Sequence, residues 1–170
     1  VPIVKRAKKV VDIYVNGTNK TSFNLFYFYN KYTNTCLKRG EIMNFSTNKE
    51  KGNTGLGIAI AYFSSNGYIV SIPLNDTQDY DLIVDKNNKI EKVQVKSTSC
   101  KTKYGVYQVS LKSCGGTKGK TYKTVINTNI DILFIITDNL DMFKIPINVI
   151  KNKTTLNLCE KYSKYSIQIN

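Results

Sequence analysis

Two neighbouring segments decide the fold, and they read Tyr80-Asp81-Leu82-Ile83-Val84-Asp85 and Val93-Gln94-Val95-Lys96. Both have the length and the β-branched side chains of strands, and the polar run Lys86-Asn87-Asn88-Lys89 predicts a short hairpin connection between them. Side chains two positions apart share one face of a strand, so Asp81, Gln94 and Lys96 are expected to converge at one edge while Val95 enters the core. The hairpin therefore predicts a place where a carboxylate, an amide and an ammonium group meet.

These three groups suit the hydrolysis of phosphodiester bonds with a divalent metal ion. The carboxylate of Asp81 would hold a hard cation, and the ammonium group of Lys96 would neutralise phosphate charge and orient the attacking water. A second interpretation stays open at this point, in which Asp81 and Lys96 form a plain cross-strand ion pair.

The charge of the chain indicates a polyanionic partner. Lys and Arg together number 25 and Asp and Glu 12 in 170 residues, a formal net charge of +13. Binding to phosphates releases counterions, so nucleic acid is the leading partner class, although abundant lysine also serves simply to keep a domain soluble. Only two residues are arginine, so contacts to the backbone are expected to outnumber contacts to bases. The residues expected to hold the backbone are Lys101, Lys103, Lys118, Lys120 and Lys123, with Lys5, Arg6, Lys8 and Lys9 of the basic N-terminal run.

The composition also excludes several kinds of site. The chain has no histidine, which removes His-based acid–base catalysis, Ser-His and Cys-His triads and His-containing zinc motifs. Its four cysteines are widely spaced, so a zinc ribbon or a redox pair is not expected, and reduced thiols in the cytoplasm or an organellar matrix fit best. The longest apolar run, residues 132–136, is strand-sized, so no membrane partner is expected.

The order of the expected elements favours an α+β fold with a mixed central sheet and a core helix. The helix is expected to run from about Leu56 to Phe63 and to stop at Asn66-Gly67. Strands are expected at residues 10–15, 23–29, 68–72, 80–85, 90–97, 105–111, 130–137, 142–146 and 155–158. The predicted organisation is a basic N-terminal arm with a hairpin at 1–48, a main domain at 49–160 and a C-terminal tail at 161–170.

A series of short motifs occurs in one order along the chain. It comprises Lys51-Gly52, the helix to Phe63, Gly67-Tyr68, Ser71-Ile72-Pro73, the two segments quoted first, Cys114-Gly115-Gly116, Asn129-Ile130-Asp131, Lys144-Ile145-Pro146-Ile147 and Leu156-Asn157-Leu158. In order and spacing the chain resembles the PD-(D/E)XK endonucleases associated with group I introns, the homing type, over about residues 43–158. The resemblance implies a restriction-endonuclease-like fold. It does not include the first 42 residues.

The resemblance also implies roles for individual residues. Asp81 is then the metal-binding acid, Gln94 stands where many relatives have Glu or Asp, and Lys96 is the catalytic lysine, with Mg²⁺ or another divalent cation as cofactor. One position departs from the pattern Lys-Gly-x-x-Gly-Glu at the helix start, because Leu56 occupies the acidic position. Mg²⁺ needs anionic oxygen ligands, so Asp79, Asp76 or the substrate phosphate would have to compensate.

Two functions follow from these observations. The first is a Mg²⁺-dependent homing-type endonuclease that cuts double-stranded DNA as a homo-oligomer, because a long target site exceeds the reach of one small subunit. The second, motivated by Leu56 and by the additional N-terminal segment, is a catalytically lapsed nuclease fold that binds RNA among the proteins of a larger ribonucleoprotein such as an organellar ribosome. A nucleotide-binding loop at Gly52–Gly57 is not supported, because neither the required third glycine nor a Walker lysine follows.

Overall fold

The computed structural model describes residues 12–14, 27–30, 35–37, 47–75, 78–114, 122–151 and 154–168, with side chains described for residues 47–75, 78–112, 124–151 and 154–168. Within these residues, no helix combines the length and the apolar character that a membrane span requires.

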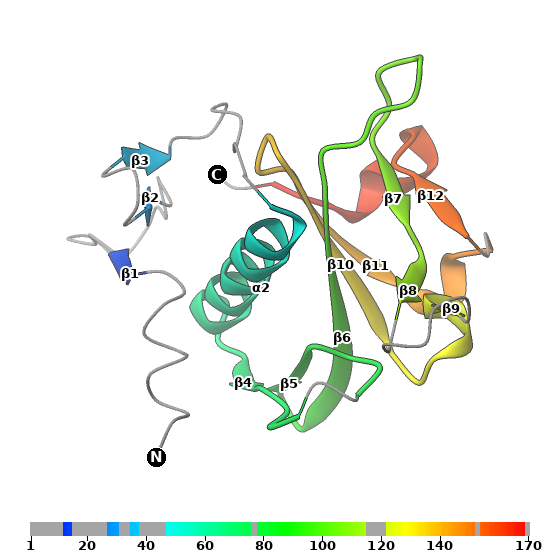
Figure 1. Ribbon diagram of the computed structural model, residues 1–170. Helices are drawn as coiled ribbons and strands as arrows, with labels where there is room; N and C mark the ends of the chain where they lie inside the picture. The colour runs from blue at the N-terminus through cyan, green and yellow to red at the C-terminus, as the bar shows by residue number, and fades with distance from the viewer. Residues whose placement is uncertain are drawn as a thin grey trace.

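A six-stranded mixed sheet forms the centre of the fold (Figure 1). Its strand order is β13-β11-β10-β6-β5-β4. Strands β6 and β10 run parallel and all other neighbours are antiparallel, which confirms the expected mixed α+β architecture. The strands are β4 (Ile69–Ser71), β5 (Leu82–Lys86), β6 (Lys89–Thr98), β10 (Ile132–Thr137), β11 (Met142–Pro146) and β13 (Ser166–Ile167).

Helix α2 (Asn48–Ser65) covers one face of this sheet. It begins where the hydroxyl oxygen of Thr47 accepts a 3.1 Å hydrogen bond from the backbone N–H of Glu50, which satisfies one of the unpaired donors of the first turn. It ends at Ser65 with Asn66 as the C-cap, after which Gly67 adopts a φ of 76° that glycine accepts without a steric penalty. The helix is longer than expected at its N-terminal end, and the stop at Asn66-Gly67 is confirmed.

Two apolar cores lie on opposite faces of the sheet. The helix-side core packs Ile58, Ala59 and Phe63 of α2 against alternate residues of the strands, among them Leu82, Val84, Val93, Val95 and Phe134. The hairpin-side core packs the intervening residues Leu133, Ile135 and Ile145 against Val109, Leu111, Leu156 and Tyr162. All six residues of β10 are buried, which explains why this strand reads as a continuous apolar run.

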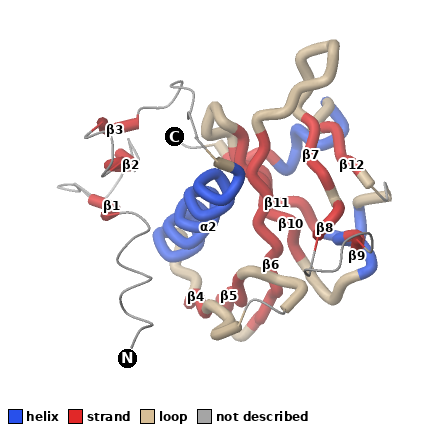
Figure 2. Tube along the Cα trace, in the orientation of Figure 1, coloured by secondary structure: helices blue, strands red, loops and turns tan. Residues whose placement is uncertain are grey.

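Smaller elements cover the second face (Figure 2). Strand β7 (Gln108–Ser110) pairs with β12 (Thr155–Asn157), and β8 (Lys112–Cys114) pairs with β9 (Tyr122–Thr124). Three short 3-10 helices lie at η1 (Val125–Asn127), η2 (Ile147–Val149) and η3 (Glu160–Tyr165). The stretch expected as a C-terminal tail contains most of η3 and β13, and β13 pairs with β11 at the edge of the central sheet.

The N-terminal segment contains a separate three-stranded sheet. Strands β1 (Asp12–Tyr14) and β2 (Tyr27–Asn30) pair antiparallel and overlap the two segments expected to be strands, and β3 (Thr35–Leu37), which was not expected, pairs with β2. The basic run at residues 5–9 lies outside the described residues. The division of the chain at residue 48 remains a prediction.

Candidate active site

Strand β6 continues past the beginning of its neighbour β5. Pairing between the two strands begins opposite Leu82 and Val93, whereas on its other side β6 stays paired with β10 from Val93 to Thr98. From Gln94 onwards, one edge of β6 therefore has no β5 residue in register beside it. Asp81, the residue just before β5, is placed next to this open edge.

The carboxylate of Asp81 accepts hydrogen bonds at this open edge. Its Oδ2 atom accepts a 2.7 Å hydrogen bond from the backbone N–H of Val95 and a second hydrogen bond from the Nε2 atom of Gln94. The backbone N–H of Asp81 donates to the carbonyl oxygen of Val93 at 2.9 Å, which fixes the main chain at the same point. Because both side-chain hydrogen bonds go to Oδ2, the Oδ1 atom remains as the position at which a cation would bind.

Burial raises the pKa of the Asp81 carboxyl above its ordinary value, because a charged carboxylate loses hydration there. The hydrogen bond from the backbone N–H of Val95 and the positive charge of Lys96 act in the opposite direction, and they are the smaller effects. A carboxylate that is held charged against a desolvation cost gains from any cation placed beside it.

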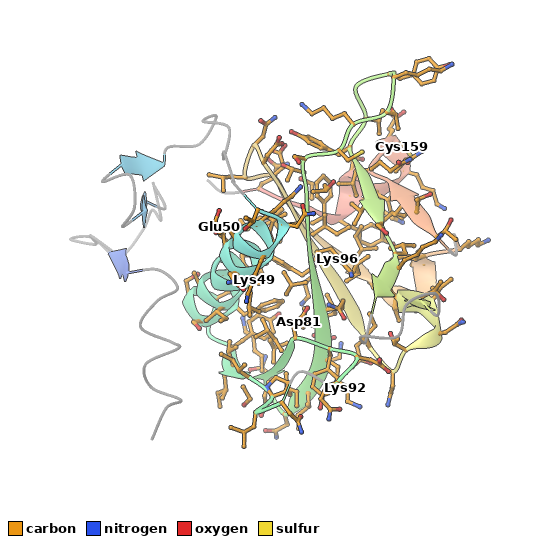
Figure 3. All side chains as sticks on the ribbon, in the orientation of Figure 1. Lys49, Glu50, Asp81, Lys92, Lys96 and Cys159 are labelled. Atoms are coloured by element: carbon orange, nitrogen blue, oxygen red, sulfur yellow. The ribbon has the colours of Figure 1, made fainter. Side chains whose placement is uncertain are left out.

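Lys96 follows Gln94 by two positions on β6 and therefore shares its face of the sheet. Its side chain is half-buried, and its Nζ atom lies 3.5 Å from the carbonyl oxygen of Lys112 at the start of β8. Figure 3 shows Asp81 and Lys96 near the middle of β6. The structure thus brings the acid, the amide and the ammonium group expected from the sequence into one place.

Asp79 is half-buried and precedes Asp81 by two positions. No group of three or more His, Cys, Asp or Glu side chains suited to a metal ion occurs in the part of the chain that the structure describes. At the open edge of β6, the Oδ1 atom of Asp81 and the Oε1 atom of Gln94 are side-chain oxygens that the hydrogen bonds to Asp81 Oδ2 leave available to a cation. This set is chemically suited to Mg²⁺, which takes oxygen ligands, is often held by one or two carboxylates, and retains several waters or substrate phosphates.

Comparison with known proteins agrees with this geometry. The profile of the family described as "PD-(D/E)XK endonuclease" matches residues 46–169, well over half of the chain. The chain belongs to the PD-(D/E)XK endonuclease family. A solved structure, that of the bacterial homing endonuclease I-Ssp6803I, matches with a TM-score of 0.59 and 25% sequence identity, over 68% of this chain and 80% of that one. No curated protein gives a significant match.

Membership of this family bears on the substrate class and on the use of metal ions. The substrate class of a PD-(D/E)XK endonuclease is nucleic acid, which agrees with the charge of the chain. Nucleases of this family generally use divalent metal ions. The family match extends to residue 169, beyond the resemblance noted from the sequence, and it includes β13 in the nuclease fold.

Leu56 lies on α2 with its side chain half-buried against the helix-side core. The preceding residue, Gly55, is next to Ser97 of β6, two positions beyond Val95. This PD-(D/E)XK endonuclease therefore has an apolar side chain at the position where the family resemblance implies an acid.

The basic residues expected to bind nucleic acid fall into three groups. Lys101 and Lys103 are exposed on the connection between β6 and β7. Lys123 lies on β9, where only the backbone is described, and the others, Lys118, Lys120, Lys5, Arg6, Lys8 and Lys9, lie outside the described residues.

Two basic residues that lie beside the site, Lys92 and Lys112, were not identified from the sequence. Lys92 precedes Gln94 by two positions on the same face of β6, and its Nζ atom lies 5.5 Å from the centre of the Tyr80 ring. Lys112 offers its carbonyl oxygen to Lys96. The period of two along β6 could have revealed Lys92, whereas Lys112 reaches the site through the packing of β8, for which the sequence gives no signal.

Proposed function

We propose that this chain is a divalent-metal-dependent homing-type endonuclease that hydrolyses phosphodiester bonds in double-stranded DNA. The observation that supports this most strongly is the carboxylate of Asp81, which is desolvated and held by Gln94 and Val95 beside the charge of Lys96.

In this proposal Asp81 is the principal metal ligand, through Oδ1. The carbonyl oxygen of Gln94 is a neutral second donor, and Asp79 is the nearest carboxylate along the chain that can add negative charge. When bound, Mg²⁺ would supply positive charge to the scissile phosphate and lower the pKa of a bound water.

Lys96 is the catalytic lysine of the proposal. Its half-buried ammonium group, whose charge partly offsets the burial that raises the pKa of the Asp81 carboxyl, would stabilise the negative charge that develops on the phosphate and orient the attacking water. Gln94 holds Asp81 in position through its Nε2 atom, which leaves its Oε1 atom to accept a hydrogen bond from water or to bind the cation.

The substrate is proposed as duplex DNA on two grounds. The solved relative is described as a homing endonuclease, and the net charge of +13 rests almost entirely on lysine, which suits contacts to the phosphate backbone. Such a substrate is longer than one subunit of this size, so a homo-oligomer is part of the proposal.

The decisive experiment compares three proteins on duplex DNA carrying an intron-homing site, with Mg²⁺ and with EDTA. Wild type is expected to cut only with the metal, and Lys96→Ala to cut at least about a hundredfold more slowly while still binding DNA. Lys89→Ala is the matched control, because it removes the same charge from an exposed end of the same strand, where the side chain makes an ion pair with Glu91 away from the site. Equal inactivity of wild type and Lys96→Ala under all conditions would refute the proposal.

A second candidate rests on Leu56. With an apolar side chain at an expected acidic position and no three-ligand cluster in the described part of the chain, the fold would serve as an RNA-binding protein of a larger ribonucleoprotein. Salt-sensitive co-sedimentation of the chain with an RNA particle, together with no DNA cleavage, would favour this candidate over the first.

A further inference from the structure

The connection between β6 and β7, together with the first residue of β7, is a structured arm. It comprises residues 99–108, which extend past the end of β6 (Figure 1). Lys101 and Tyr107 form an antiparallel bridge, and backbone hydrogen bonds of 2.8 Å join Gln108 to Cys100 and Thr102 to Val106. The arm turns at Thr102, whose carbonyl oxygen accepts a 2.9 Å hydrogen bond from Gly105, a glycine with a φ of 78°.

The base of the arm is tied to the nuclease fold at several points. The hydroxyl of Tyr107 donates a 2.5 Å hydrogen bond to Asp138, and the hydroxyl of buried Thr98 donates one of 2.5 Å to the carbonyl oxygen of Gln108. The Nζ atom of Lys51 on α2 donates to Ser99 at 2.7 Å. The arm is therefore an extension of the sheet with a fixed direction.

The tip of the arm carries an exposed aromatic ring beside a cation. The side chain of Tyr104 is 80% exposed, and the Nζ atom of Lys103 lies 4.9 Å from the centre of its ring. Lower on the arm, the Nζ atom of Lys101 lies 4.5 Å from the centre of the Tyr107 ring. Residues 99–108 contain no carboxylate, so all the side-chain charge of the arm is positive.

An exposed tyrosine at a turn contributes nothing to the core, and its surroundings match one kind of partner. Lysines bind phosphates as point charges, and an aromatic ring packs against sugars and bases of any sequence. Tyr104 follows Lys96 by eight positions along the chain, so at ~3.3 Å per residue it lies at most about 26 Å from the site, the length of about eight base pairs of duplex.

We propose that this arm binds the same DNA duplex on which the active site acts, within about eight base pairs of the scissile bond. Lys101 and Lys103 bind backbone phosphates, and the ring of Tyr104 packs into the groove between them. The arm contributes to affinity and to the length of the bound site, and it takes no part in the chemistry. This inference rests on the proposed duplex substrate.

Binding of the full chain to duplex DNA in EDTA, measured by fluorescence anisotropy at several salt concentrations, tests the arm separately from cleavage. Tyr104→Ala is expected to weaken binding about fivefold or more, whereas Tyr104→Phe, which keeps the ring, binds within about twofold of wild type. Lys103→Ala is expected to reduce the slope of log affinity against log salt by about 0.9. Lys164→Ala is the matched control, since its Nζ atom also lies over a tyrosine ring, at 5.1 Å from the centre of Tyr165.

The outcomes separate the two proposals. If wild type binds and cuts DNA while Tyr104→Ala and Lys103→Ala behave like Lys164→Ala, the arm proposal fails and the proposed function stands. If wild type binds no duplex DNA, the proposed function fails and the arm proposal with it. If Tyr104→Ala instead abolishes concentration-dependent self-association and leaves DNA binding unchanged, the arm is a contact between copies of the chain, which overturns the proposal.

Discussion

A Cβ atom placed on Gly55 of α2 would lie 1.9 Å from the hydroxyl oxygen of Ser97 on β6. That hydroxyl is buried and has no hydrogen-bond partner among the described residues. The helix thus approaches the side chain of Ser97 closely along the open edge of β6, and the glycine leaves the space that this hydroxyl occupies.

We expect Gly55→Ala to lower the free energy of unfolding by about 1–3 kcal/mol, because the added methyl group displaces Ser97 in a packed interface. Ser97→Ala removes the obstructing hydroxyl and an unsatisfied polar atom, so it is expected to be neutral or stabilising by up to about 1 kcal/mol. Combining both changes should recover most of the loss, since alanine also favours the helix. Urea denaturation of the four proteins measures the coupling, and strictly additive effects would contradict this account.

Asp81→Asn should stabilise the metal-free protein at neutral pH. The folded state raises the pKa of this carboxyl above its ordinary value of 3.8. Between the unfolded-state pKa and the folded-state pKa, the folded protein therefore binds more protons than the unfolded protein, and its stability falls as the pH rises. Above the folded-state pKa the whole cost of the buried charge is present, and asparagine removes it while its side-chain oxygen still accepts hydrogen bonds from Gln94 and Val95. The stability difference between the two proteins should therefore shrink as the pH is lowered towards 3.8. Thermal unfolding from pH 7 to pH 4 checks this, and a difference that grows on acidification would show that the sign is wrong.

Gln94→Glu should make stability depend strongly on divalent metal. The substitution replaces the hydrogen bond from Nε2 to Asp81 by two adjacent carboxylates, which is expected to cost about 1–3 kcal/mol in EDTA. A second anionic ligand should then allow millimolar Mg²⁺ to raise the melting temperature more than it does in wild type. Gln108→Glu provides the control, because it also removes a donated hydrogen bond, here to Asn157 at 2.9 Å, away from the site. An equal response of both variants to Mg²⁺ would exclude a metal site at Asp81.

Leu56→Glu tests whether the missing carboxylate limits metal binding. We expect this variant to bind Mg²⁺ more tightly than wild type and to cut DNA faster at low metal concentration, at some cost in stability from the lost apolar contact. Ile60→Glu is the matched control, because Ile60 lies one helical turn further along and packs against the same helix-side core. Titration calorimetry with Mg²⁺ distinguishes the two variants. Identical affinities for Mg²⁺ would mean that position 56 does not face the site.

The sequence allowed much of the central sheet to be predicted, because each strand there satisfies local rules. Alternation along residues 80–97 indicated which side chains share a face, and the two asparagines of the connecting turn, Asn87 and Asn88, adopt the positive φ values of 54° and 62° that a two-residue hairpin needs. The strands that were missed, β3, β8, β9 and β13, are only two or three residues long. Strands this short carry too little periodicity for detection, and their pairing depends on partners far along the chain.

By itself, the sequence determined the chemistry that this chain has to work with: a carboxylate, an amide and an ammonium group on adjacent strands, a large excess of lysine, and no histidine. These follow from composition and from the two-residue period of a strand, which are local properties. Only the tertiary structure decided that β6 extends beyond its pairing with β5, so that Asp81 accepts a hydrogen bond from the unpaired N–H of Val95. It also decided that Leu56 packs into an apolar core and that residues 99–108 form an arm with Tyr104 at its tip. Each of these depends on strand register or on packing between distant segments, and the energies that fix register are summed over the whole sheet.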